Sequence, residues 1–163
     1  MKRLTFLTTL ALLLLLLALP TLAAGPTIIV NGFGPFFIPA ANGCGAFDVS
    51  VTPEAGKPNG GRIILFANVA IFQGPVFATL TNDSTGKSVS LNISGPAKAI
   101  FATNTEVLKG PTLLVGFTAP APPNLQGVVL AHGQTVVKFD PVTGNLISVS
   151  FNGTTENVCP LLG

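Results

Sequence analysis

Tryptophan and tyrosine are absent from this 163-residue chain, and charged residues make up only 9% of it. Globular proteins average roughly 25% charged residues, so this surface must be built from Ser, Thr, Asn, Gly and backbone groups. The aromatic residues are twelve phenylalanines. Sugar-binding sites usually stack aromatic rings that also carry a polar group, which phenylalanine lacks. A carbohydrate-binding module is therefore disfavoured.

Net charge is also lacking once the first 24 residues are set aside. The rest of the chain holds six Lys or Arg residues and six Asp or Glu residues. Nucleic-acid binding depends on basic side chains that neutralise phosphates, so we expect no nucleic-acid partner. For the same reason we expect no basic patch that would bind anionic lipid.

Residues that carry chemistry are scarce. His132 is the one histidine, and because Gly133 follows it we interpret it as a turn residue at a strand end. Structural zinc needs four Cys or His ligands, and the chain has three such residues. The sequence predicts no metal, no cofactor and no catalytic triad. Paired carboxylates stay open, because they meet in space rather than in sequence.

The first 24 residues have the three-part layout of a secretory signal peptide. A basic start precedes an apolar run over residues 6–19, and Pro20 ends that run. Small residues then favour cleavage near Ala23 or Ala24. We expect a signal helix over residues 1–24, and a protein secreted to the extracellular space or cell envelope without a stable membrane anchor. The alternative is an uncleaved anchor, since about 20 apolar residues cross a bilayer.

Cysteine occurs twice, at Cys44 and Cys159. In an exported protein, an isolated pair of this kind predicts one disulfide. The bond would close a loop of about 115 residues, for which the chain-entropy estimate is about 4–5 kcal/mol.

A hydrophobic period of two indicates β-strands from residue 46 onward. Apolar and polar residues alternate over residues 47–51, 89–93 and 147–151. The residues that we expect to face the core are Phe47, Val89, Leu91, Ile147 and Val149. Further strands are expected at residues 27–30, 62–69, 76–81, 97–102, 112–117, 127–131 and 134–140. The prediction is an all-β domain over residues 46–163, an antiparallel β-sandwich or small β-barrel of about 8–9 strands.

Two hairpin turns are readable at residues 82–87 and 140–145. In each, Asp starts the turn and Gly takes the position that needs a positive φ. Residues 85–95 also align without gaps to residues 143–153. Either a duplicated hairpin or convergence on the same turn chemistry explains that likeness.

Residues 25–45 form a segment rich in Gly, Pro and Phe. Its prolines argue against a central strand or a helix. Phe33, Phe36, Phe37 and Ile38 lie within six residues there. An exposed cluster of this kind marks an interaction surface. The alternative is that these side chains cap one end of the core, because large apolar residues are usually buried.

Three motifs occur in order along the chain. They are C-G-x-x-D-V within residues 42–49, T-N-x-x-T-G-K-S-V within residues 80–89, and T-x-x-x-C-x-L-L within residues 154–163. Together they resemble small secreted proteins of uncharacterised function from actinobacteria and related bacteria. The resemblance implies an exported β-fold whose first strand is tied to its C-terminus, and it implies no activity and no catalytic residues.

We therefore expect a secreted, non-catalytic β-domain with a surface-mediated or envelope-associated structural role. Its partner would be a protein, a cell-wall polymer or an apolar small molecule. The first alternative is a small β-barrel that binds an apolar ligand, which an inward cavity of about 300 Å³ would favour. The second is a hydrolase, which two carboxylates about 5–9.5 Å apart in a cleft would favour.

Overall fold

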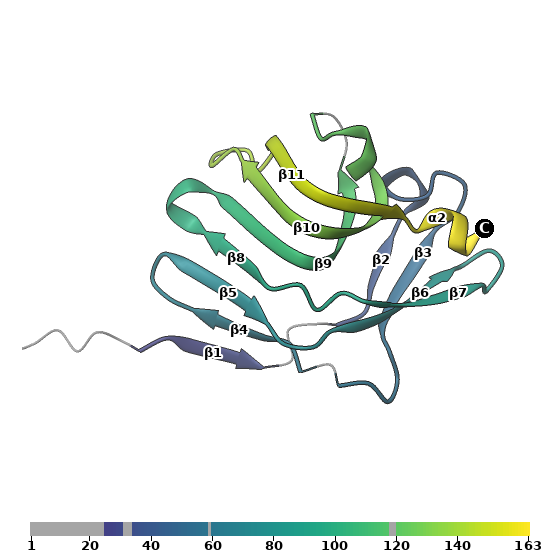
Figure 1. The fold of residues 1–163 in the computed structure, drawn as a ribbon, viewed down its shortest axis with the longest axis horizontal. Helices are drawn as coiled ribbons and strands as arrows, with labels where there is room; N and C mark the ends of the chain where they lie inside the picture. The colour runs from purple at the N-terminus through teal and green to yellow at the C-terminus, as the bar shows by residue number, and fades with distance from the viewer. Residues whose placement is uncertain (1–24, 31–33, 59, 118–119) are drawn as a thin grey trace, which may run out of the picture.

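The computed structural model describes residues 25–30, 34–58, 60–117 and 120–163 (Figure 1). The expected signal peptide, including its cleavage sites, and Phe33 lie outside these residues. Over the described ranges the chain is all-β, as predicted, with eleven strands in two antiparallel sheets. One short helix, α2 (Cys159–Leu162), lies at the C-terminal end.

The larger sheet, sheet A, has the strand order β1-β4-β5-β8-β9-β10-β11, and sheet B has the order β2-β3-β6-β7. The strands of sheet A are β1 (Thr27–Val30), β4 (Arg62–Leu65), β5 (Val69–Gln73), β8 (Ala97–Ile100), β9 (Thr105–Phe117), β10 (Gly127–Phe139) and β11 (Leu146–Asn157). Those of sheet B are β2 (Phe36–Ile38), β3 (Val49–Pro53), β6 (Phe77–Asn82) and β7 (Ser88–Asn92). Single turns of 3-10 helix occur at η1 (Ala40–Asn42), η2 (Phe101–Thr103) and η3 (Pro123–Leu125). Neither sheet closes on itself.

Two strands of sheet B, β6 and β7, continue strands of sheet A. β5 pairs with β8 while β6 pairs with β7, so these four elements form one long hairpin that bends between the sheets. Glycine stands at both bends. A Cβ atom on Gly74 would lie 2.6 Å from the carbonyl oxygen of Gly60, and one on Gly95 would overlap the carbonyl oxygen of Lys109. The strand number exceeds the expected 8–9 because β2 was not expected and the strand expected over residues 62–69 is divided between β4 and β5.

Three glycines also form a row across β9, β10 and β11. Gly133 is the register partner of both Gly110 and Gly153. A Cβ atom on Gly133 would overlap the carbonyl oxygen of Asn152. Glycine inside a strand often marks such a close backbone approach. The interpretation of His132 as a turn residue is therefore wrong, because the His132–Gly133 pair lies in the middle of β10.

The main core lies between sheet B and one end of β10. Its buried residues are Ile38, Val49, Val51, Ala78, Leu80, Val128, Leu130, Val158 and Leu162. Phe47, Val89 and Leu91 pack against it, as predicted. A second cluster, Leu114, Leu125, Val129 and Ala131, fills the other face of β9 and β10 beneath η3. Val149 packs against this second cluster, also as predicted.

The prediction that Ile147 faces the core is wrong, since its side chain is 46% exposed. The cause is a shift in register between β10 and β11. Phe139 pairs with Leu146, whereas Lys138 pairs with Ser148. Ile147 is thus the extra residue of a β-bulge, where the alternation of side chains between the two faces is interrupted.

Both predicted hairpins are confirmed, with a change at the first. Asn82 Oδ1 accepts hydrogen bonds from the backbone N–H groups of Ser84 and Thr85 at 2.8 and 3.3 Å, so this turn starts at Asn82 and not at Asp83. Asp140 Oδ1 does the same for Val142 and Thr143 at 3.0 and 2.7 Å. Elsewhere, the expected strand over residues 62–69 is divided between β4 and β5, and the two expected over residues 127–140 join as β10.

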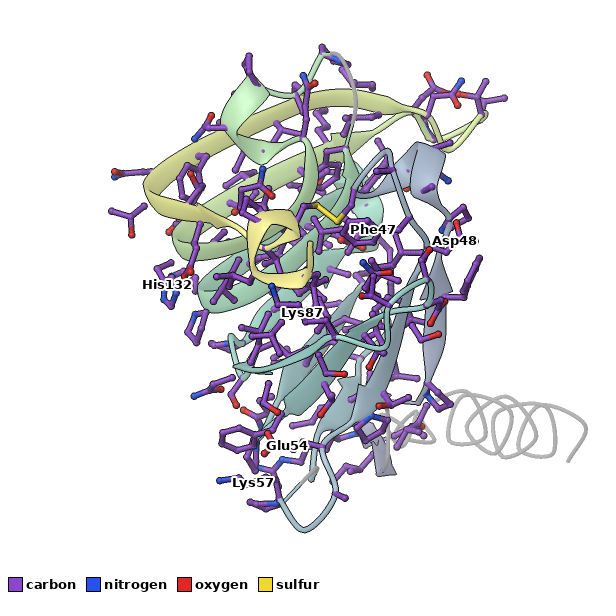
Figure 2. The ribbon with its side chains drawn as sticks, turned by 90° about the vertical axis from the view of Figure 1, so that its right-hand side faces the viewer. Phe47, Asp48, Glu54, Lys57, Lys87 and His132 are labelled. Atoms are coloured by element: carbon purple, nitrogen blue, oxygen red, sulfur yellow. A yellow bond between two sulfur atoms is a disulfide. The ribbon has the colours of Figure 1, made fainter. Side chains whose placement is uncertain are left out.

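The C-terminus is held in place by a disulfide and two hydrogen bonds. Cys44 and Cys159, 115 residues apart, are bonded as predicted, with their Cα atoms 5.4 Å apart. Asn82 Nδ2 donates to the carbonyl oxygen of Leu162 at 3.1 Å, and Lys87 Nζ donates to that of Gly163 at 2.6 Å. Figure 2 shows the disulfide next to α2 and Lys87 below the helix. Helix α2 is therefore attached to the core from both ends.

The glycine row gives a first prediction. Gly133→Ala should lower the free energy of unfolding by about 1–3 kcal/mol, because the new methyl group overlaps backbone that cannot retreat without breaking the β10–β11 pairing. Gly34→Ala is the control, since an added Cβ meets nothing within 4 Å there. Urea unfolding followed by far-UV circular dichroism measures both. Equal stability of the two variants would contradict the close approach of β10 and β11.

The disulfide gives a second prediction. Replacing both cysteines by serine should cost about 2–5 kcal/mol of stability, because the unfolded chain regains the entropy of a long open loop. Thermal unfolding of the oxidised protein, the reduced protein and the double variant would measure this loss. Mass spectrometry without reduction should find no alkylated thiol in the native protein, and two alkylated thiols would refute the bond.

Candidate functional site

The predicted interaction surface falls on β2, an edge strand of sheet B. The side chains of Phe36 and Phe37 are 42% and 54% exposed. Ile38, by contrast, is 2% exposed and pairs with the buried Val49. Ile38 is therefore part of the core and not of the exposed surface. Because alternate side chains of a strand share a face, Phe36 lies on the same side as Ile38 and Phe37 points to the outer face. What remains of the predicted cluster in the described chain is the pair of phenylalanines.

One edge of sheet A is apolar as well. β1 lies at that edge, and its residues Ile28 and Ile29 are 55% and 43% exposed. No charged residue occurs between Gly25 and Phe47. Sheet edges are usually protected by charged side chains, prolines or bulges. We call Ile28, Ile29, Phe36 and Phe37 the apolar edge; sequence reasoning found its β2 half and missed its β1 half.

The opposite edge of sheet A has a different character. On β11, the exposed residues Ser148, Ser150 and Asn152 alternate with the partly buried Val149 and Phe151, and Gly153 and Thr154 are also exposed. The bulge at Ile147 interrupts the pairing at one end of this strand. Polar side chains and a bulge both discourage pairing with another strand. The apolar edge therefore differs from the other edge of the same sheet.

The outward face of sheet B is rich in hydroxyl groups. Thr81 and Ser88 are register partners whose hydroxyl oxygens lie 2.9 Å apart, and those of Thr79 and Ser90 lie 3.4 Å apart. Ser50 pairs with both Thr81 and Phe37, so the phenylalanine borders this face. Cross-strand hydroxyl pairs supply polarity where charged residues are few.

Three surface grooves have volumes of about 170, 270 and 320 Å³. The smallest is lined by Ile63 and Phe72 among others, and the largest by Lys98 and Lys109 above apolar residues. None of the three is lined by a buried residue of either core cluster. They are therefore not the inward cavity that the β-barrel hypothesis requires.

The lining of the groove of 270 Å³ includes two carboxylates, those of Glu106 and Asp140. Asp140 Oδ1 accepts hydrogen bonds from the N–H groups of Val142 and Thr143 and from the hydroxyl group of Thr143. The backbone donors of Thr143 and Val142 lower the pKa of Asp140 below its ordinary value. A general acid needs a raised pKa, so Asp140 is suited to holding its turn and not to donating a proton.

His132 is exposed on β10, where its register partners are Thr154 and Pro111. In the part of the chain that the structure describes, no group of three or more His, Cys, Asp or Glu residues is placed to hold a metal ion.

The described ranges contain no helix with the length and hydropathy needed to span a bilayer.

The strand register gathers basic residues on one face of sheet A. Lys98 on β8 pairs with Val107 on β9, and Lys109 lies two residues after Val107 on β9. Lys138 on β10 pairs with Thr105, which lies two residues before Val107. On β5, Ile71 pairs with Lys98, and Gln73, two residues further along, pairs with Arg62. Side chains of register partners share a face. Four of the six basic residues after residue 24 therefore share one face, which a count of charges could not reveal; Glu156, paired with Leu130, lies at its far end.

No family model, no curated protein and no solved structure matches this chain. The resemblance to small secreted actinobacterial proteins therefore stays a prediction. The disulfide indicates an oxidising compartment, because reducing compartments keep such thiols in the reduced state.

The turn at Asp140 gives a third prediction. Because the folded state lowers the pKa of Asp140, its contribution to stability is present above the unfolded value of about 3.9 and is lost as pH falls through the lower folded value. The backbone amide resonances of Val142 and Thr143 should therefore shift in NMR spectra recorded below about pH 4. Asp140→Asn should remove this titration. Shifts that persist in that variant would assign the titration to another group.

Proposed function

We propose that this chain is an exported, non-catalytic β-domain that acts by contact, and that the apolar edge is where it meets a protein partner. The observation that carries the proposal is the exposure of Phe37, Ile28 and Ile29 on edge strands of both sheets, in a stretch without a single charge. An uncharged, apolar edge strand accepts a further strand by backbone hydrogen bonding.

Export is supported by two independent features. The first 24 residues have the composition of a signal peptide, and the chain forms a disulfide that links distant points. The scarcity of charge and the hydroxyl-covered face of sheet B fit a protein whose solubility depends on neutral polar groups. The packing of sheet B onto β10, with free edges on both sheets, favours a β-sandwich over a barrel.

Strand addition also explains why the apolar residues occur on both faces of the edge. Ile28 and Ile29 are adjacent in β1, so they point to opposite faces of sheet A. A strand that adds to β1 would place its own side chains on both faces and would cover both residues. A partner that lies flat on one face would cover only one of them.

The test compares edge variants with a control of similar exposure elsewhere. Ile29→Lys places a charge on the edge of sheet A, and Phe37→Ser removes the most exposed side chain of β2. Ile147→Ser is the control, because Ile147 is 46% exposed but lies on β11. All three are surface changes, so melting should report stability within about 0.5 kcal/mol of the native protein.

Sedimentation velocity over a range of concentrations and retention of the protein by cell-envelope fractions are the two measurements. We expect the native protein and Ile147→Ser to associate in at least one assay, and both edge variants to lose that association. If the edge variants match the native protein in both assays, or if the native protein associates in neither, the proposal is overturned.

A further inference from the structure

The groove of about 320 Å³ lies on the basic face of sheet A and combines an apolar floor with two ammonium groups. Ile71, Lys98 and Val107 are consecutive register partners on β5, β8 and β9. Ile71 and Val107 are half-buried, while Lys98 is exposed. Ile100 extends the floor along β8, and Lys109 completes the groove on β9.

The wall of the groove at Pro96 is fixed in position by backbone hydrogen bonds. The N–H of Lys109 donates to the carbonyl oxygen of Pro96 at 2.9 Å, and the N–H of Gly95 donates to that of Pro111 at 2.7 Å. Gly95 is so close to β9 that a Cβ atom would overlap the carbonyl oxygens of Lys109 and Pro111. This wall is therefore formed before any ligand arrives, which reduces the cost of ordering on binding.

The charges of the groove have one sign. Lys98 and Lys109 are its only ionisable lining residues, and no carboxylate lines it. Lys138 and Arg62 lie on the same face of the sheet, outside the lining. Lys side chains bury their methylene stems along apolar surface and keep the ammonium group in water. An occupant that matches this arrangement has an apolar body and an anionic end.

We propose that this groove, which we call the Lys98–Lys109 groove, binds a single-chain fatty acid. The alkyl chain lies along Ile71, Val107 and Ile100, and the carboxylate accepts hydrogen bonds from the ammonium groups of Lys98 and Lys109. At about 320 Å³ the groove lies at the lower end of the 300–1,000 Å³ that ligand sites usually occupy, which favours an occupant with one alkyl chain. The site lies on central strands of sheet A, and it is independent of the apolar edge proposed to meet a protein.

The probe is laurate, kept below its critical micelle concentration, with the exported protein purified with its disulfide intact. Isothermal titration calorimetry should show one saturable site per chain. Affinity should fall as salt is added, because the ion pairs are exposed to solvent. Dodecyltrimethylammonium has the same chain with the opposite charge, and acetate has the charge without the chain. Neither should bind.

The test variant is Lys98→Gln with Lys109→Gln. It should bind laurate roughly three- to tenfold more weakly, since exposed ion pairs contribute modestly. The matched control is Lys57→Gln with Lys138→Gln, which removes the same charge from exposed lysines outside the groove. This control should bind laurate like the native protein. Val107→Thr keeps the shape of the floor but adds a hydroxyl group, and it too should weaken binding.

Melting curves recorded without ligand show whether each variant is folded, and only folded variants are compared. Because the protein has no Trp or Tyr, a fluorescent fatty acid can replace laurate as a second probe without interference from the protein. Absence of saturable laurate binding by the native protein overturns the proposal. So does equal loss of affinity in the control pair, because the effect would then come from net charge and not from this groove.

Discussion

A strand that continues from one sheet into another must bend, and in this chain both bends occur at glycines, which have no side chain. Gly74 and Gly95 stand where the long hairpin leaves sheet A for sheet B, each followed by a proline. Their Cα atoms lie so near neighbouring backbone that no Cβ atom fits. The packing of sheet B against β10, and hence the main core, follows from these bends. Glycine contributes nothing to the core itself, yet the core could not form without it.

The chain compensates in two ways for having few charges. Hydroxyl groups on the outward face of sheet B pair across strands, so polarity there comes with hydrogen bonds already satisfied. The disulfide between Cys44 and Cys159 also stabilises the fold, because it constrains the unfolded chain over 115 residues. Exposed ion pairs would add little stability by comparison. Lys87 is used in the same region, where it binds the carbonyl oxygen of the last residue.

Local patterns predicted much of the fold because they act locally. Alternation placed Phe47, Val89, Leu91 and Val149 against the core, and turn chemistry located both hairpins. Errors arose where pairing between distant strands decides the outcome. Ile147 has the right alternation but occupies a bulge that depends on β10. His132 precedes a glycine that resembles a turn residue, but Gly133 is there to let β11 approach.

In the candidate site too, the features that depend on local sequence could be predicted and those that depend on strand pairing could not. Exposure of Phe37 could be suspected from a phenylalanine-rich segment between prolines, whereas the burial of Ile38 depends on its pairing with Val49. The contribution of β1 required knowledge of which strands form the sheet edges.

The distribution of charge shows why composition alone misleads for a β-protein. After residue 24, six basic and six acidic residues cancel in a sum, but a sheet assigns each residue to a face by its register. Lys98 and Lys109 lie on different strands, eleven positions apart, and nothing between them suggests that they meet. Because β8 and β9 pair antiparallel through Lys98 and Val107, the two lysines border one groove with no carboxylate in its lining. The neutral part of the chain after residue 24 thus has a local positive field above an apolar floor, and this field acts only locally, since screening limits charge interactions to about 8–10 Å at physiological salt.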